Sequence, residues 1–296
     1  MIGRSRGIKM HKPRVIIMRH SERLDFALGS HEWPAEAFSS GSYAPTAMEM
    51  PTFLPLREDP MEYSLDTPLS RHGRAHARHT GEFFRSVGLI PNRVYTSPAM
   101  RCVQTADAVL DGIGIRNRVS LRLDLALHEP TRIDLPIQTS SFFSSAGFLV
   151  DNNYRANMSP RNGSVIVNES RAEYHRRMYE FLRRVIAKLI NQNVSTAVSA
   201  MPPTILIVTH RPCVTLLAAF LNIDEADDKI EYLENMLNNR GDVRFLSMVV
   251  AEFDPATRLW SFLSEFPKRQ LAQPFKAVQN RHRYRSSYSY RRIHGK

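Results

Sequence analysis

Residues 15–23 read VIIMRHSER, a short apolar run followed at once by a histidine that stands between arginines. Four apolar residues bounded by charge predict a strand buried on both faces. In open α/β sheets, ligands bind at the carboxyl ends of such strands. Two guanidinium groups beside an imidazole suit a phosphoryl group, which they bind through paired, planar hydrogen bonds. If residues 19–23 are considered alone, the alternative to a phosphate site is a charged turn on the surface.

A second apolar run, TILIVT at residues 204–209, also ends in a histidine and an arginine, His210 and Arg211. If the two runs are neighbouring buried strands, their histidines lie at one pocket. A structural histidine in the core is the alternative role of His210.

The segment VYTSPAMRCVQTA at residues 94–106 predicts a strand, a Ser-Pro turn and a helix, with Arg101 in the first helical turn. The N-terminus of a helix attracts anions because its first N–H groups have no partner in the helix. Farther along, Glu129 follows the short apolar run at 125–127. A solvated loop carboxylate is the alternative for Glu129.

Together these motifs resemble the histidine phosphatase superfamily, also called phosphoglycerate mutase-like, and within it the branch of the suppressor of T-cell receptor signalling proteins and insect ecdysteroid-phosphate phosphatase. The resemblance covers about residues 14–263. The stretches that carry it are residues 19–23, 67–70 with Gly73, 95–106, Glu129 and 208–210. It implies an α/β fold, a three-layer sandwich whose mostly parallel central sheet has helices on both faces.

The resemblance also implies roles for individual residues: His20 is the nucleophile, Glu129 the proton donor, and the phosphate pocket consists of Arg19, Arg23, Arg101 and His210. The chemistry of these side chains agrees with those roles. Neighbouring arginines lower the pKa of an imidazole and keep it unprotonated for attack. They also neutralise the charge spread over a transferring phosphoryl group. A leaving alkoxide needs a proton, which a carboxyl group can supply.

One position departs from the family pattern, because Ser21 stands where the family has glycine after the nucleophilic histidine. Glycine permits close approach of the backbone to a ligand. A serine hydroxyl could instead donate a hydrogen bond to the phosphate, so Ser21 is counted among the phosphate-binding residues. Pro212 also departs from the pattern and fits only in the first turn of the following helix.

The triplet Arg71-His72-Gly73 repeats the family motif but follows a helix-start signal with Ser70 as N-cap, not a buried strand. Nucleophile duty is therefore not expected of His72. With His76 and His79 it lies on one helix face, where a zinc site competes with a solvated polar face. The polar face is favoured, so we expect neither a metal nor another cofactor.

The chain has 296 residues, of which 43% are hydrophobic, as in an ordinary globular fold. We expect a basic N-terminal segment at 1–13, a phosphatase-like domain at 14–265 with irregular insertions near 26–66 and 131–167, and a basic, disordered tail at 266–296. Within the domain, residues 169–191 predict an amphipathic helix and residues 245–263 a hairpin. The first insertion is long enough to cover the pocket and influence substrate choice.

No apolar run approaches the about 20 residues needed to span a bilayer, and the two cysteines, Cys102 and Cys213, suggest no disulfide framework. A cytoplasmic enzyme without a membrane partner is the expectation. Its partners would be a phosphomonoester, either a phosphotyrosyl protein or a small phosphorylated alcohol, and a second copy in a homodimer. A mutase is a lesser alternative. The tail interleaves arginine with tyrosine, so the rival is a catalytically weak adaptor or nucleic-acid-binding protein.

Overall fold

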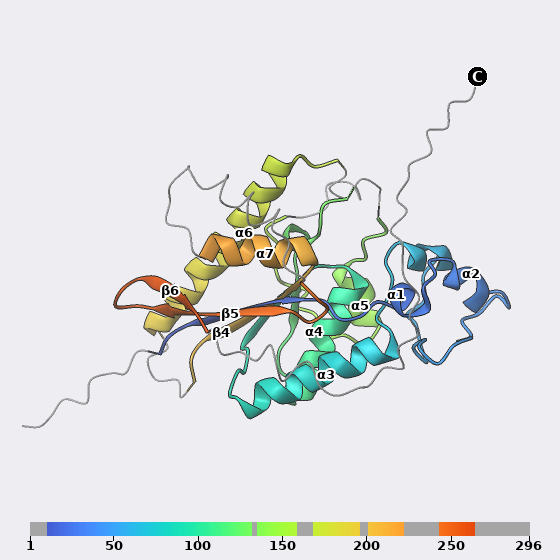
Figure 1. Cartoon of the computed structure of the whole chain (residues 1–296), viewed down its shortest axis with the longest axis horizontal. Coiled ribbons are helices and arrows are strands. Elements are labelled where there is room, and N and C mark those ends of the chain that lie inside the picture. The colour runs from blue at the N-terminus through green and yellow to red at the C-terminus, as the bar shows by residue number, and fades with distance from the viewer. Residues whose placement is uncertain (1–10, 132–134, 159–167, 196–200, 222–242, 264–296) are drawn as a thin grey trace, which may run out of the picture. The chain divides into compact units, whose positions relative to one another are not determined.

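Six strands form one mixed sheet in the computed structural model (Figure 1). Their order across the sheet is β3-β2-β4-β1-β5-β6. The structure describes residues 11–131, 135–158, 168–195, 201–221 and 243–263. Four neighbouring strands are parallel: β3 (Leu121–Leu123), β2 (Arg93–Thr96), β4 (Thr204–Thr209) and β1 (Arg14–Arg19). The hairpin of β5 (Met248–Asp254) and β6 (Leu259–Phe262) joins β1 antiparallel.

Helices cover both faces of the sheet (Figure 1). On one face lie α3 (Arg71–Ser86) and α4 (Met100–Ile113), and on the other α6 (Arg171–Ser195) and α7 (Arg211–Leu221). The predicted three-layer sandwich with a mostly parallel sheet is therefore confirmed. The helix expected at 169–191 is α6, and the hairpin expected at 245–263 is β5 with β6.

The two central strands bring the two candidate histidines to one edge of the sheet. β1 and β4 are buried strands that pair in parallel, with Arg19 opposite Thr209 at their carboxyl ends. The next residue, His20, donates its backbone N–H to the carbonyl of Thr209 at 2.8 Å. His20 and His210 therefore leave the sheet at the same level. Pro212 is the second residue of α7, where its missing N–H costs little.

Two glycines let α3 and α4 pack closely. A Cβ atom at Gly81 would lie 2.0 Å from the carbonyl oxygen of Val109, and one at Gly112 would lie 1.9 Å from that of Arg78. No larger residue fits at either position without moving a backbone. This close packing fixes α4 and therefore the place of Arg101 at its start. Ser70 caps α3 as predicted, because its hydroxyl accepts the N–H of Gly73 at 2.9 Å.

The two insertions contain short helices that the sequence analysis did not predict. The segment 26–66 holds the end of α1 (Leu24–Leu28), then α2 (Trp33–Ala37) and a 3₁₀ turn η1 (Pro60–Ser64). The described part of 131–167 holds α5 (Ser140–Ser145). Between β3 and Glu129 the chain forms a second 3₁₀ turn, η2 (Leu125–Leu127).

The expected basic segment at 1–13 lies almost wholly, and the tail at 266–296 wholly, outside the described residues. All the described residues belong to one compact unit, residues 1–264, and the tail is not part of that unit. Among the helices described, none is long and apolar enough to cross a membrane.

Candidate active site

His20 is buried at the end of β1 and has one nitrogen available for chemistry. Its Nδ1 lies 2.7 Å from the backbone carbonyl of Ser21. A carbonyl only accepts hydrogen bonds, so Nδ1 carries the proton of the neutral ring and Nε2 keeps a free lone pair. Burial, followed by the charges of Arg101 and His210, holds the pKa of His20 well below its ordinary value. The imidazole is therefore neutral at physiological pH and suited to attack.

His210 lies beside His20, with the two rings 5.6 Å apart and steeply inclined. Both of its nitrogens have side-chain partners. Nδ1 lies 3.2 Å from Nη2 of Arg101 and 3.2 Å from Oε1 of Glu129, and Nε2 lies 2.9 Å from the hydroxyl of Ser97. Burial lowers the pKa of His210 as well. A structural histidine would also be fully buried with both nitrogens engaged, so the binding of phosphate by His210 stays a prediction.

Arg101 and Glu129 form the charged centre of the site. The Nη2 of Arg101 donates to Oε1 of Glu129 at 2.6 Å, and the Arg101 side chain is almost completely buried. Burial raises the pKa of Glu129, but His210 and Arg101 together outweigh it, and the pKa lies well below its ordinary value. Glu129 is therefore a carboxylate in this arrangement of side chains.

The N-terminus of α4 is not the open anion site that the sequence indicated. Asp66, at the end of the first insertion, accepts the backbone N–H of Met100 through Oδ1 at 2.9 Å. The same oxygen lies 3.7 Å from Nη1 of Arg101, and the other carboxylate oxygen accepts Nη2 of Arg57 at 2.6 Å. Asp66 thus compensates the helix end and helps to orient Arg101. Nothing in the local pattern around Asp66 indicated this role, which depends on contacts distant in the sequence.

Arg19 is held over an aromatic ring at the edge of the site. Its guanidinium lies 4.2 Å above the ring of Phe245, and Nη1 donates to the carbonyl of Val243 at 2.7 Å. Burial, and then the charge of Arg211, lower the pKa of Arg19 to about 10. The ring of Phe245 is also 5.7 Å from that of His20 and 5.1 Å from that of Phe26. Phe245 has no motif around it and was not predicted.

Two predicted phosphate ligands have other partners in the structure. Arg23 makes a two-pronged ion pair with Asp25. The Ser21 hydroxyl donates to the carbonyl of Gly73 at 2.7 Å, and the Ser21 backbone N–H donates to Thr105 at 2.9 Å. Arg23 is near enough to lower the pKa of His210. Their binding of phosphate stays a prediction.

A third histidine, His128, belongs to the site and was missed. Its buried ring lies 5.0 Å from that of His210, and its Nδ1 donates to the backbone carbonyl of Glu129 at 2.8 Å. Burial, and then His210 and Arg101, lower the pKa of His128 to about 3. The sequence contained a signal that could have identified His128, because this histidine, like His20 and His210, follows an apolar run.

Neither cysteine is poised for oxidation. Cys102 and Cys213 are both buried and unpaired, and burial raises the pKa of each thiol. A raised pKa keeps a thiol protonated and unreactive.

His72, in the triplet that repeats the family motif, lies exposed on α3, and its ring is 5.1 Å from that of His76. Among the residues that the structure describes, no three side chains gather as ligands for a metal ion.

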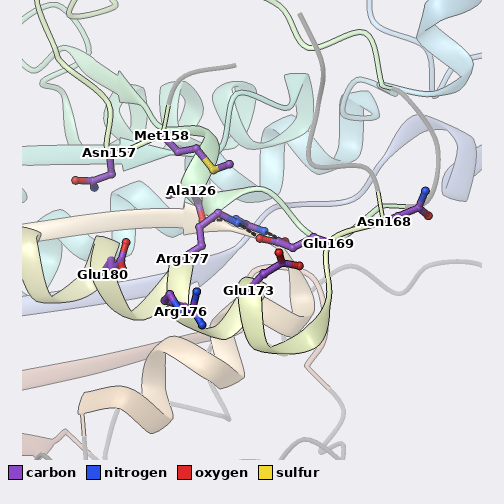
Figure 2. Close-up of a pocket in the computed structure, with 9 residues that line it drawn as sticks. All are labelled: Ala126, Asn157, Met158, Asn168, Glu169, Glu173, Arg176, Arg177 and Glu180. Carbon is purple, nitrogen blue, oxygen red and sulfur yellow. Dashed lines mark hydrogen bonds and ion pairs between the residues drawn. The ribbon is translucent and has the colours of Figure 1, made fainter. Parts of the chain in front are cut away.

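A cavity of about 550 Å³ lies beside the first turns of α6 (Figure 2). None of His20, Arg101, Glu129 and His210 lines it. Its lining residues are Ala126, Asn157, Met158, Asn168, Glu169, Glu173, Arg176, Arg177 and Glu180. It is therefore distinct from the cluster of histidines and arginines.

Residues 56–236 match the model of the histidine phosphatase superfamily (branch 1). The match covers more than half of the chain, so this chain belongs to the histidine phosphatase superfamily. The matched region includes Arg101, Glu129 and His210 but begins after His20. The assignment of His20 therefore depends on the sequence motif and on the geometry described above.

Named relatives agree with the family. The chain is 31% identical over 181 residues to human ubiquitin-associated and SH3 domain-containing protein B, covering 59% of this chain and 27% of that protein. It is 34% identical over 148 residues to ecdysteroid-phosphate phosphatase of Bombyx mori, covering 48% of this chain and 22% of that protein. The chain thus spans about a quarter of the length of the curated relatives that it matches.

A solved structure has the same fold over most of the chain. It is the ecdysone phosphate phosphatase of Bombyx mori, determined in complex with tungstate, and it aligns with a TM-score of 0.70. The alignment covers 85% of this chain and 92% of that one at 23% identity.

Proposed function

We propose that this protein hydrolyses phosphomonoesters through a phosphohistidine on His20, with Glu129 as the proton donor. The observation that carries the proposal is a pair of unused donors. The Nε atoms of Arg19 and Arg101 are buried and have no hydrogen-bond partner among the described residues. A buried donor without a partner costs about 1–3 kcal/mol. Phosphoryl oxygens between the two guanidinium groups would satisfy both.

In the first step, the Nε2 lone pair of His20 attacks phosphorus and the bond from phosphorus to the ester oxygen breaks. That oxygen takes a proton from the Glu129 carboxyl and leaves as an alcohol or phenol. In the second step, water attacks the phosphohistidine and gives a proton to the Glu129 carboxylate. The phosphorus–nitrogen bond then breaks and inorganic phosphate is released. Arg19 and Arg101 balance the negative charge in both steps, and His210 contributes a hydrogen bond.

The lowered pKa of Glu129 needs an account, because a proton donor must be protonated. Its partner Arg101 is the same group that would bind the phosphoryl oxygens. A phosphate dianion would draw on the charge of Arg101 and place a like charge beside the carboxylate, and both effects raise the pKa of Glu129. Binding of substrate would therefore favour the protonated form of Glu129, which the first step requires.

For the leaving group, we propose an apolar or aromatic alcohol. Phe26 is 65% exposed and packs against Phe245, which in turn lies beside the ring of His20. The exposed ring of Phe26, packed against the half-buried Phe245, offers a surface for an apolar group. The name of the related ecdysteroid-phosphate phosphatase points to a substrate of that kind. A phosphotyrosyl protein fits the same surface.

The experiment is turnover of a phosphomonoester panel in the presence of EDTA, with acid-quench trapping of a phosphoenzyme. A steroid phosphate, a phosphotyrosyl peptide and glycerol phosphate separate the leaving groups. We expect an acid-labile phosphohistidine in the wild type and a preference for the first two compounds. Absence of turnover and of phosphoenzyme with all three would contradict the proposal.

A further inference from the structure

The carbonyl groups that precede Glu129 are bound by one arginine on a different layer of the fold. Arg177, on α6, directs Nη1 at the backbone carbonyls of Ala126 at 2.6 Å, His128 at 3.1 Å and Leu125 at 3.4 Å. The Arg177 side chain is 7% exposed. A buried guanidinium that serves three carbonyls of one turn fixes that turn more firmly than a single hydrogen bond would.

The remaining carbonyl of this turn is bound by a residue of the sheet. The hydroxyl of Thr209 donates to the carbonyl of Leu127 at 2.7 Å. Thr209 is the last residue of β4 and directly precedes His210. The turn that ends in Glu129 is thus fastened both to the strand that delivers His210 and to α6.

Glu169 completes the arrangement. Its carboxylate accepts Nε of Arg177 at 2.8 Å and Nη2 at 2.5 Å, and its side chain is 6% exposed (Figure 2). The residue before it, Asn168, donates its backbone N–H to the carbonyl of Thr131 at 3.1 Å. The segment 168–177 therefore contacts the chain on both sides of Glu129, through Arg177 before it and Asn168 after it.

We propose that the Glu169–Arg177 pair positions the carboxyl group of Glu129 for proton donation. Neither side chain of the pair is a catalytic residue; each acts through the backbone of residues 125–131. The Glu129 side chain is one-third exposed. Arg101 and His210 contact its carboxylate directly, and the anchored backbone fixes the position from which the side chain reaches them and the leaving oxygen. This inference rests on the proposed function, in which the breaking bond to phosphorus leaves an oxygen that takes the Glu129 proton.

The test is the dependence of kcat/KM on the leaving group, because a misplaced acid harms only leaving groups that need a proton. Arg177→Lys keeps the charge but loses the planar fork. We expect it to lower kcat/KM for phenyl phosphate about 10- to 100-fold, within the range of general acid catalysis. For 2,4-dinitrophenyl phosphate, whose phenolate leaves without a proton, we expect a change of less than about 3-fold. Glu169→Gln should give the same pattern with a smaller loss.

Three further variants make the result interpretable. Arg176→Lys is the same substitution on the neighbouring exposed residue, which lies apart from the Glu169–Arg177 pair in Figure 2, and it should change neither substrate's kcat/KM. Glu129→Gln should show the leaving-group pattern at full size. Combined with Glu129→Gln, Arg177→Lys should cause no further loss with phenyl phosphate, because both changes disable one function.

Equal losses of Arg177→Lys with both substrates would overturn the inference, as would an additive double variant. If Glu129→Gln shows no leaving-group pattern, the proposed role of Glu129 fails instead. If Glu129→Gln shows the pattern and Arg177→Lys does not, only the positioning role fails. Thermal melting of each variant excludes unfolding as the cause.

Discussion

His20 and His210 occupy equivalent places, at the carboxyl ends of two adjacent parallel strands, yet their surroundings differ. The Nδ1 of His20 is bound to a backbone carbonyl, which leaves Nε2 with its lone pair. His210 has both nitrogens engaged by the side chains of Arg101, Glu129 and Ser97. The strand end places each histidine at the site, and the partners of its ring nitrogens determine whether one nitrogen keeps a free lone pair.

The largest effect is expected from His20→Ala. Of the rings of His20 and His210, this change removes the one that has a free nitrogen. We expect turnover of an aryl phosphate to fall by about 10⁴-fold or more, because the covalent route is lost. Steady-state kinetics and acid-quench trapping of the phosphoenzyme measure this.

His72, in the Arg71-His72-Gly73 triplet, supplies the control. His72→Ala changes a second Arg-His-Gly-like position on the exposed face of α3, and it should leave turnover and trapping unchanged. Retention of a labelled phosphohistidine in His20→Ala would show that another histidine is the nucleophile.

His210→Gln should reduce turnover by about 10²- to 10³-fold, the size of losing one group that stabilises the transition state. Phosphoenzyme should still form on His20, only more slowly, so rapid-quench kinetics distinguish this variant from His20→Ala. If the two variants are equally inactive and neither is labelled, the assigned difference between the two strand ends is wrong.

His128 extends the comparison to stability. The pKa of His128 in the folded protein is about 3, compared with about 6.5 for an unperturbed histidine. Below pH 6.5, His128 becomes protonated in the unfolded chain but stays unprotonated in the folded protein. The free energy of unfolding therefore falls as pH falls. Between pH 7 and pH 5 this costs about 2 kcal/mol. His128→Asn, whose amide can still donate to the carbonyl of Glu129, should lose stability over this interval by about 2 kcal/mol less than the wild type.

Chemical denaturation at several pH values measures that difference. The buried histidines His20 and His210 also have lowered pKa values, so the variant keeps part of the pH dependence. Stability curves for variant and wild type that stay parallel from pH 7 to pH 5 would contradict the prediction.

Much of the sheet and of the site was predictable because both depend on local patterns. The apolar runs at 15–18 and 204–209 became β1 and β4, and the Ser-Pro turn led into α4 with Arg101 in its first turn. The helix cap at Ser70 correctly separated the Arg71-His72-Gly73 triplet from the true strand end. These features depend on residues within a few positions of one another.

The parts that were not predicted depend on contacts between distant segments. Asp66 reaches Met100 and Arg101 only because the first insertion folds over the start of α4. Arg177 meets the turn before Glu129 across about 50 positions of sequence. Arg23 is a local exception: it pairs with Asp25, only two positions along the chain, at the start of α1, and motif matching does not consider such a contact. Charge and periodicity identify such residues as polar or buried but not as partners.

The smallest effect is expected at Ser21, where the difference from the family pattern lies directly beside the nucleophile. Its hydroxyl donates to the carbonyl of Gly73, and its backbone N–H to Thr105, so no hydroxyl proton remains for phosphate. Ser21→Ala and Ser21→Gly should each lower the free energy of unfolding by about 0.5–1.5 kcal/mol, because the buried hydrogen bond from the hydroxyl to the carbonyl of Gly73 is lost. Both should leave kcat/KM within about 3-fold of the wild type. Comparing the two variants separates the hydroxyl from the Cβ atom: a gain in kcat/KM for glycine alone would mean that the Cβ atom crowds the phosphate, and equal losses in both without loss of stability would mean that the hydroxyl binds it.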